Sequence, residues 1–216
     1  MALPRILVLI SGNGSNLQAL IDRSADGIIP GQIVSVVSSS AKAYGLERAA
    51  EAKIPSRVHA LKEYYTGVPK EDVSGRKAAR AQFNRDLVSL IINEVKPDLI
   101  VCAGWMLILS EDFLEPLENA SIPIINLHPS LPGAFEGINA IERSYEAGQN
   151  GTVAKGGCMI HKVIKEVDRG QPLVVREIDV VKGETLESWE QRIHALEHQA
   201  IVDGTVKALK ELVRVD

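Results

Sequence analysis

The chain has 216 residues, a mass of 23.4 kDa, a formal net charge of −4 at pH 7 and a pI near 5.8. This length is sufficient for one domain with a sizeable core. The acidic balance, without a long Lys/Arg run, argues against nucleic acid as a partner. No apolar run approaches the roughly 20 residues that span a bilayer. We therefore expect a cytoplasmic protein in which Cys102 and Cys158 are reduced core residues.

The first apolar run, residues 6–10, predicts a buried strand, and the sequence SGNGSN at residues 11–16 turns it into a helix that begins near Leu17. A strand, a glycine turn and a helix direct free backbone N–H groups at an anion. The dinucleotide fingerprint would need glycine at Leu17 and an acidic residue where residues 38–40 are serines. The loop therefore favours a phosphate monoester over a nicotinamide cofactor, and a plain structural turn remains the alternative.

The segments that follow alternate between strand and helix patterns up to residue 128, which predicts a doubly wound, mostly parallel sheet with helices on both faces. The expected strands cover residues 33–37, 57–59, 98–103 and 122–125, the expected helices cover residues 44–53 and 76–94, and residues 61–75 are expected to form a surface loop. In the C-terminal part we expect a helix over residues 139–147, antiparallel strands over 152–163 and 173–181, and a long helix over 185–213 with Thr185 as its N-cap.

The apolar run at residues 122–125 ends at two polar residues, Asn126 and His128, which are followed by Pro129 and Pro132. Ligands bind at the carboxyl end of the strands in an open α/β sheet. Residues two apart on a strand point to the same side, so the amide and the imidazole lie together. The two prolines stiffen the chain where it leaves the strand, and a catalytic pair must be held in a fixed position. On its own, the motif also fits a loop histidine beside a turn-forming asparagine.

A carboxylate, Asp168, lies in the polar turn between the two antiparallel strands. An ionised carboxylate beside an imidazole fixes its tautomer and raises its pKa above the ordinary value of about 6.5. Asp168 is thus a candidate partner for His128. The alternative is that the sequence Asp-Arg-Gly forms only a turn.

Together, SGNGSN after the first strand, NLHPSL at residues 126–131 and the later segment from His161 to Gly170 resemble the phosphoribosylglycinamide formyltransferase family of folate-dependent enzymes. The likeness covers residues 6 to about 206 and is strongest to fungal members. It implies a single formyltransferase domain over residues 1–216, with a phosphate-binding half up to about residue 100 and a folate-binding, catalytic half from about 101.

The resemblance implies formyl transfer from 10-formyltetrahydrofolate to the amine of phosphoribosylglycinamide in purine synthesis, without a metal. Such acyl transfer needs an oxyanion donor and a proton shuttle. The catalytic residues would be His128, Asn126 and Asp168, and the acceptor substrate would bind to Gly14, Ser15, Asn16 and Glu197. The folate would bind to Arg80, Met106, Leu107, Ile108, Leu109, Asn126, Ile164 and Asp168. Glu197 could instead be an ordinary exposed helix carboxylate.

Two departures from the family pattern concern the folate site: Leu107 stands where many bacterial members have Arg, and the exit after residue 131 is shorter. Two other functions stay open, a formyltetrahydrofolate hydrolase of the same superfamily and a non-catalytic module that binds a phosphorylated metabolite. We expect small-molecule substrates, no nucleic acid or membrane partner, and a monomer or weak homodimer.

Overall fold

The structure is a computed structural model that describes residues 2–212. One seven-stranded sheet runs through it in the order β3-β2-β1-β4-β5-β6-β7. The first five strands in this order are parallel, and β6 and β7 are antiparallel to their neighbours, as the sequence predicts. The strands are β1 (Arg5–Ile10), β2 (Gln32–Ser38), β3 (Ser56–Val58), β4 (Leu99–Cys102), β5 (Ile124–His128), β6 (Lys155–Lys162) and β7 (Pro172–Asp179).

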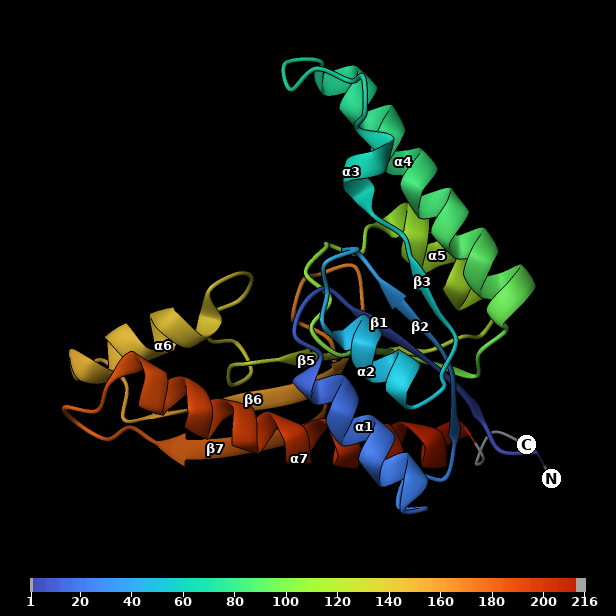
Figure 1. Cartoon of the computed structure of the whole chain (residues 1–216). Coiled ribbons are helices and arrows are strands. Elements are labelled where there is room, and N and C mark those ends of the chain that lie inside the picture. Colours follow the sequence, from blue (N-terminus) through green and yellow to red (C-terminus); the bar gives the residue numbers. More distant parts are fainter. Residues whose placement is uncertain (1, 213–216) are drawn as a thin grey trace.

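Helices cover both faces of the sheet (Figure 1). They are α1 (Ser15–Ala25), α2 (Gly45–Glu51), α3 (Leu61–Tyr64), α4 (Val73–Ser89), the π-helical segment η1 (Leu90–Val95), α5 (Glu111–Asn119), α6 (Ala140–Gln149) and α7 (Leu186–Leu212). The predicted doubly wound architecture is confirmed. The last residue of the predicted C-terminal helix, Val213, lies outside the described residues.

Strand β1 shows why the fold has two cores. Its alternate residues Ile6, Val8 and Ile10 pack with α1 and α7 in one cluster, while Leu7 and Leu9 pack with α4 and α5 in the other. All five side chains are buried, as expected for a central parallel strand. This position fixes the carboxyl end of β1 in the middle of the sheet edge.

The long helix α7 packs directly on β6. Gly204 makes this close approach possible, since a Cβ there would lie 2.6 Å from Cγ2 of Ile160. At its N-terminus the Thr185 hydroxyl accepts a hydrogen bond from the Ser188 N–H (3.2 Å), so the predicted N-cap is confirmed. The two cysteines, Cys102 and Cys158, are buried free thiols.

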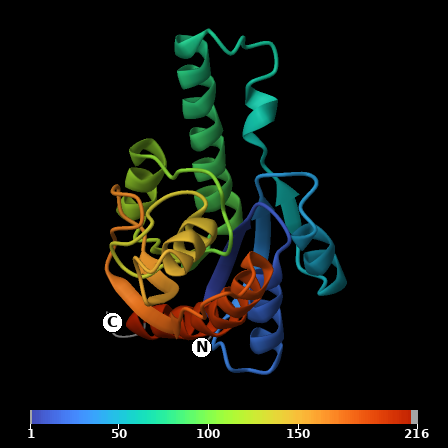
Figure 2. The same cartoon turned by 90° about the vertical axis from the view of Figure 1, so that its left-hand side faces the viewer.

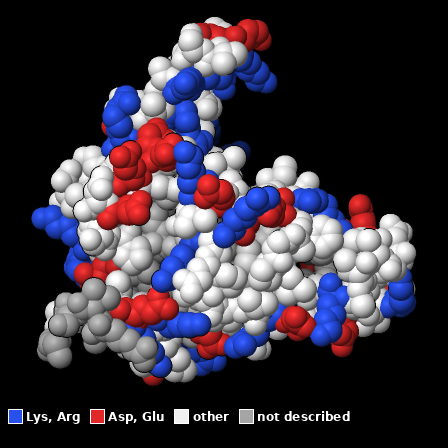
Figure 3. Space-filling view, turned by 180° about the vertical axis from the view of Figure 1, so that it is seen from behind, with Lys and Arg blue, Asp and Glu red and all other residues white. Residues whose placement is uncertain are grey.

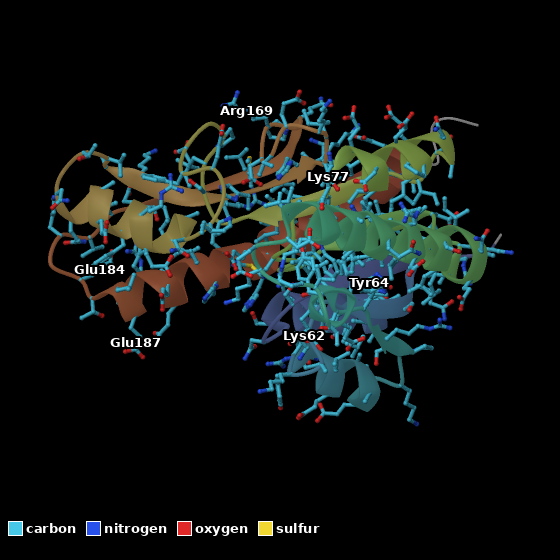
Figure 4. The ribbon with its side chains drawn as sticks, turned by 90° about the horizontal axis from the view of Figure 1, so that it is seen from above. Lys62, Tyr64, Lys77, Arg169, Glu184 and Glu187 are labelled. Carbon is cyan, nitrogen blue, oxygen red and sulfur yellow. The ribbon has the colours of Figure 1, made fainter. Side chains whose placement is uncertain are left out.

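The segment 61–75 is not the loop that the sequence predicts, because it contains α3 and the first turn of α4. Asp72 caps α4 by accepting a hydrogen bond from the Gly75 N–H (2.8 Å). Helices α3 and α4 project from the sheet as an arm (Figures 1 and 2). Tyr64 of α3 lies beside α4 (Figure 4), and its hydroxyl donates to Asp86 (2.9 Å). Lys and Arg side chains lie along this arm in the view from behind, with Asp and Glu side chains at its tip (Figure 3).

Sequence patterns gave no helix between β4 and β5, yet α5 occupies residues 111–119 there. Pro116 lies inside this short helix, where proline is a helix breaker. Its start does carry a recognisable pattern, since Ser110 precedes Glu111 and Asp112 in the first turn. No described helix is long and apolar enough to cross a membrane.

Candidate active site

The histidine at the end of β5 meets the aspartate of the β6–β7 turn. Nδ1 of His128 lies 3.3 Å from Oδ2 of Asp168, and both side chains are almost fully buried. Nδ2 of Asn126 lies 3.5 Å from the other carboxylate oxygen of Asp168. Asn126 and His128 therefore do point to the same side, and the predicted meeting of His128 and Asp168 is confirmed.

A fourth residue, His161 on β6, joins this cluster and was not identified from the sequence. Its Nδ1 lies 2.9 Å from the carbonyl oxygen of Lys162, which can only accept, so Nδ1 carries a proton. The neutral ring then accepts at Nε2 from Asn126 (3.2 Å), whereas a protonated ring donates to Asp168 (3.5 Å). The antiparallel register that pairs Asn126 with His161 brings them together.

The β6–β7 turn is held against the exit loop that follows β5. Asp168 adopts a left-handed backbone conformation (φ 56°), and its Oδ2 accepts a hydrogen bond from the Gly137 N–H (2.9 Å). Arg169, which points outward (Figure 4), pairs with Glu136 of the exit loop (3.0 Å). A left-handed non-glycine residue costs free energy and persists only where its surroundings hold it. The turn thereby fixes the carboxylate beside the imidazole.

Burial has the largest effect on the pKa of the histidine. Burial lowers the pKa of His128 below its ordinary value, and the charge of His161 lowers it further, although Asp168 and two backbone contacts oppose this. The sequence-based expectation of a raised pKa is therefore wrong, because desolvation of the imidazolium outweighs its attraction to the carboxylate. Burial raises the pKa of Asp168, but the hydrogen bonds from His161 and Gly137 and the charge of His128 bring it below its ordinary value.

The glycine turn after β1 requires glycine for two reasons. Gly14 has a left-handed φ of 75°, and a Cβ there would lie 2.6 Å from Cα of Gly45 in α2. Ser15 and Asn16 open helix α1, whose first turn contains no acidic residue. Backbone N–H groups at such a helix start favour an anion.

Glu197 of α7 reaches the same turn. It is buried (3% exposed), and its Oε2 accepts from Nδ2 of Asn16 (3.1 Å) and from Nδ1 of His194 (3.0 Å). The alternative of an ordinary exposed helix carboxylate is wrong. The hydrogen bond to Glu197 raises the pKa of His194, which burial only partly opposes. His194 was not identified as a site residue from the sequence.

These groups surround one cavity of about 410 Å³. Asn16 and Glu197 line one part of it, and Asn126, His128 and Asp168 line another. The remaining wall is largely apolar and includes Met106, Leu107, Ile108, Leu109, Ile138 and Ile164. A mostly apolar cavity with few convergent polar groups is typical of a small-molecule site.

Three predicted site residues, Gly14, Ser15 and Arg80, are not among the residues that line the cavity. The guanidinium of Arg80 donates to the carbonyl oxygen of Ile108 and lies 5.3 Å from the ring centre of Phe83. Arg80 thus supports the apolar loop from behind. Within residues 2–212, no group of three or more His, Cys, Asp or Glu side chains could hold a metal ion.

Comparison with known proteins identifies the class to which this fold and site belong. Residues 4–205 match the family model for formyl transferase, and the chain therefore belongs to the formyl transferase family. Within that family, it is similar over most of its length to proteins named phosphoribosylglycinamide formyltransferase. The Saccharomyces cerevisiae protein of that name is 53% identical over 96% of this chain and 98% of its own length. The Schizosaccharomyces pombe protein is 46% identical over 92% and 94%.

The fold comparison agrees with the sequence comparison. The crystal structure of phosphoribosylglycinamide formyltransferase from Anaplasma phagocytophilum superposes with a TM-score of 0.78 at 33% identity, covering 98% of this chain and 89% of that one. The resemblance predicted from the motifs, including the likeness to fungal members, is confirmed.

Proposed function

We propose that this chain transfers the formyl group of 10-formyltetrahydrofolate to the amine of 5′-phosphoribosylglycinamide. The observation that carries the proposal is the single cavity bounded by the glycine-turn contact of Asn16 with Glu197 and by the buried cluster of His128, Asn126 and Asp168. An anionic acceptor and an acyl donor can meet there. The names of the relatives agree with formyl transfer to this acceptor.

The reaction moves an acyl group between two nitrogens. The acceptor amine attacks the formyl carbon, the carbonyl oxygen gains negative charge, and the bond to the donor nitrogen then breaks. We assign Asn126 and His128 to the developing oxyanion, because an amide N–H and an imidazole at one strand end suit it. Nε2 of His128 is buried without a partner in the described structure, so the imidazolium form of the ring can donate its Nε2 proton to the leaving nitrogen.

Asp168 completes the proton balance. The amine becomes positively charged as it attacks and must lose a proton, which we assign to water ordered by the Asp168 carboxylate. The lowered pKa of this carboxyl group keeps it ionised near neutral pH, so it can stabilise the imidazolium form of His128. Asn126 and His161 hold the carboxylate from the other side.

The acceptor and donor use different walls of the cavity. We assign the acceptor phosphate to the backbone N–H groups of Gly14, Ser15 and Asn16, and the acceptor's hydroxyl groups to Glu197. We assign the flat donor ring to the apolar wall of Met106, Leu107, Ile108, Leu109 and Ile164, next to Asn126 and Asp168. Arg80 contributes from outside the cavity lining by fixing the carbonyl of Ile108.

A formyl-transfer assay with purified protein tests this proposal. We expect tetrahydrofolate and N-formyl product to form at equal rates, and only when phosphoribosylglycinamide is present. Formate released without the amine would indicate the hydrolase instead. Binding of both ligands without turnover would indicate the non-catalytic module.

Three further expectations remain predictions. Buried free thiols at Cys102 and Cys158 support a reducing cytoplasmic location, and fractionation of cells tests it. Sedimentation velocity tests the expected monomer or weak homodimer. Limited proteolysis tests the single domain over residues 1–216, whose sheet is continuous across the expected division near residue 100.

A further inference from the structure

The loops at the two ends of the cavity leave the sheet side by side. Strands β1 and β4 are parallel neighbours, with Leu9 opposite Cys102. The glycine turn begins directly after β1 with Ser11, and the apolar loop that starts at Gly104 follows β4. A contact between these two loops therefore joins the proposed acceptor end to the proposed donor end.

One hydroxyl group makes such a contact. Oγ of Ser11 accepts a hydrogen bond from the Met106 N–H (2.9 Å), and it also pairs with the hydroxyl of Ser39, which follows β2 (2.7 Å). The Ser39 backbone N–H donates to the carbonyl of Ile10, so Ser39 is itself fixed at the sheet edge (3.0 Å). Ser11 thus contacts one neighbouring strand end and, through a separate hydrogen bond, the loop of another.

The apolar loop is also anchored by Trp105, which is buried in the second core cluster, and by Leu107 and Leu109, which pack against that cluster. It starts at Gly104, whose left-handed φ of 85° glycine adopts without strain, and its far end is held through the carbonyl of Ile108 by Arg80. The Met106 and Ile108 side chains are 67% and 66% exposed and line the cavity. Ser11 thus fixes the backbone N–H of Met106, whose own side chain is exposed and not packed in the core.

We propose that Ser11 is a positioning residue that couples the two substrate sites, so that acceptor binding at the glycine turn strengthens donor binding at the apolar loop. This inference rests on the proposed function. A ligand on the N–H groups of residues 14–16 orders the turn that contains Ser11, and an ordered Ser11 restricts Met106 to one position. Coupling between two sites is reciprocal, so donor binding strengthens acceptor binding by the same factor.

The test measures the dissociation constant of tetrahydrofolate with and without phosphoribosylglycinamide, by titration calorimetry. This pair forms a ternary complex that cannot react, because neither ligand carries a formyl group. We expect the acceptor to tighten tetrahydrofolate binding by about fivefold or more in the unmodified protein, the lower end of typical coupling. In Ser11→Ala the ratio should fall to near one.

Two variants separate coupling from general damage. Ser39→Ala removes the partner of Ser11 but leaves the Met106 contact, so it should retain most of the ratio, and Ser11→Thr retains a hydroxyl and should restore it. A merely structural role would weaken both ligands without changing their ratio. If Ser11→Ala does not fold, Ser11→Cys, with a weaker acceptor of similar shape, should give an intermediate ratio.

Several outcomes would overturn the inference: a ratio near one in the unmodified protein, an unchanged ratio in folded Ser11→Ala, or an equal loss in Ser39→Ala. Failure of the unmodified protein to bind either ligand alone would instead overturn the proposed function. The two failures are thus distinguishable.

Discussion

Replacing Asp168 by Asn removes the negative charge that opposes the desolvation of His128 while preserving the size of the side chain. Asn also tolerates the left-handed backbone conformation of this position (φ 56°), and its side-chain oxygen can still accept from Gly137. Burial already lowers the pKa of His128, and loss of the carboxylate lowers it further. The imidazolium form, the proposed general acid, should then disappear at lower pH.

The contacts set the expected size of the effect. The carboxylate lies 3.3 Å from His128 and 3.5 Å from His161. A hydrogen bond that involves a charged group contributes about 1.5–3 kcal/mol, which corresponds to roughly 10- to 150-fold in kcat/KM. We expect a loss in this range at neutral pH, together with a shift of the pH profile to lower pH.

The assay is kcat/KM for formyl transfer against pH, with folding checked by circular dichroism. Glu166→Gln, the same charge change at an exposed position of the same turn, is the matched control and should leave the profile unchanged. His128→Ala should lose about 10²-fold or more, and the double variant should be little worse than the worse single variant, because the two residues act as a unit. Additive losses, or an unmoved profile in Asp168→Asn, would refute this account of the site.

Three further predictions concern the glycine turn, α7 and the sheet. Gly14→Val should weaken acceptor binding more than folate binding in calorimetry. It should also lower the melting temperature, because Gly14 has a left-handed φ and a side chain there would contact α2. Equal loss of binding for both ligands in a folded variant would contradict the assignment. Glu197→Gln should weaken acceptor binding and lower the pKa of His194, because in the unmodified protein the carboxylate holds that pKa above its ordinary value. NMR titration of His194 measures the change, and an unchanged pKa would show that the pair is not formed. Gly204→Ala should cost about 1–3 kcal/mol of unfolding free energy in a denaturant titration, because its Cβ would overlap Ile160; an unchanged stability would mean that α7 can shift away from β6.

Local patterns were sufficient for most of the fold. Buried strands such as β1 are continuous apolar runs, and the glycine and proline residues that end them are visible in the sequence. Patterns failed where two local preferences compete, as in α5, where an acidic first turn precedes Pro116, and in α3, which is a single short turn. In such segments the contacts with the rest of the chain decide the conformation.

For the site, the sequence by itself determined which residue types stand at the strand ends: the glycine turn, Asn126 with His128, and a carboxylate in a later turn. Only the tertiary structure brought His161 beside Asn126 and buried Glu197 against Asn16, because these pairs come from distant segments whose register no local pattern encodes. The tertiary structure also decided that the pKa of His128 lies below its ordinary value and not above it. A neighbouring charge can be predicted from a motif, but the desolvation that outweighs it depends on how completely the rest of the chain excludes water.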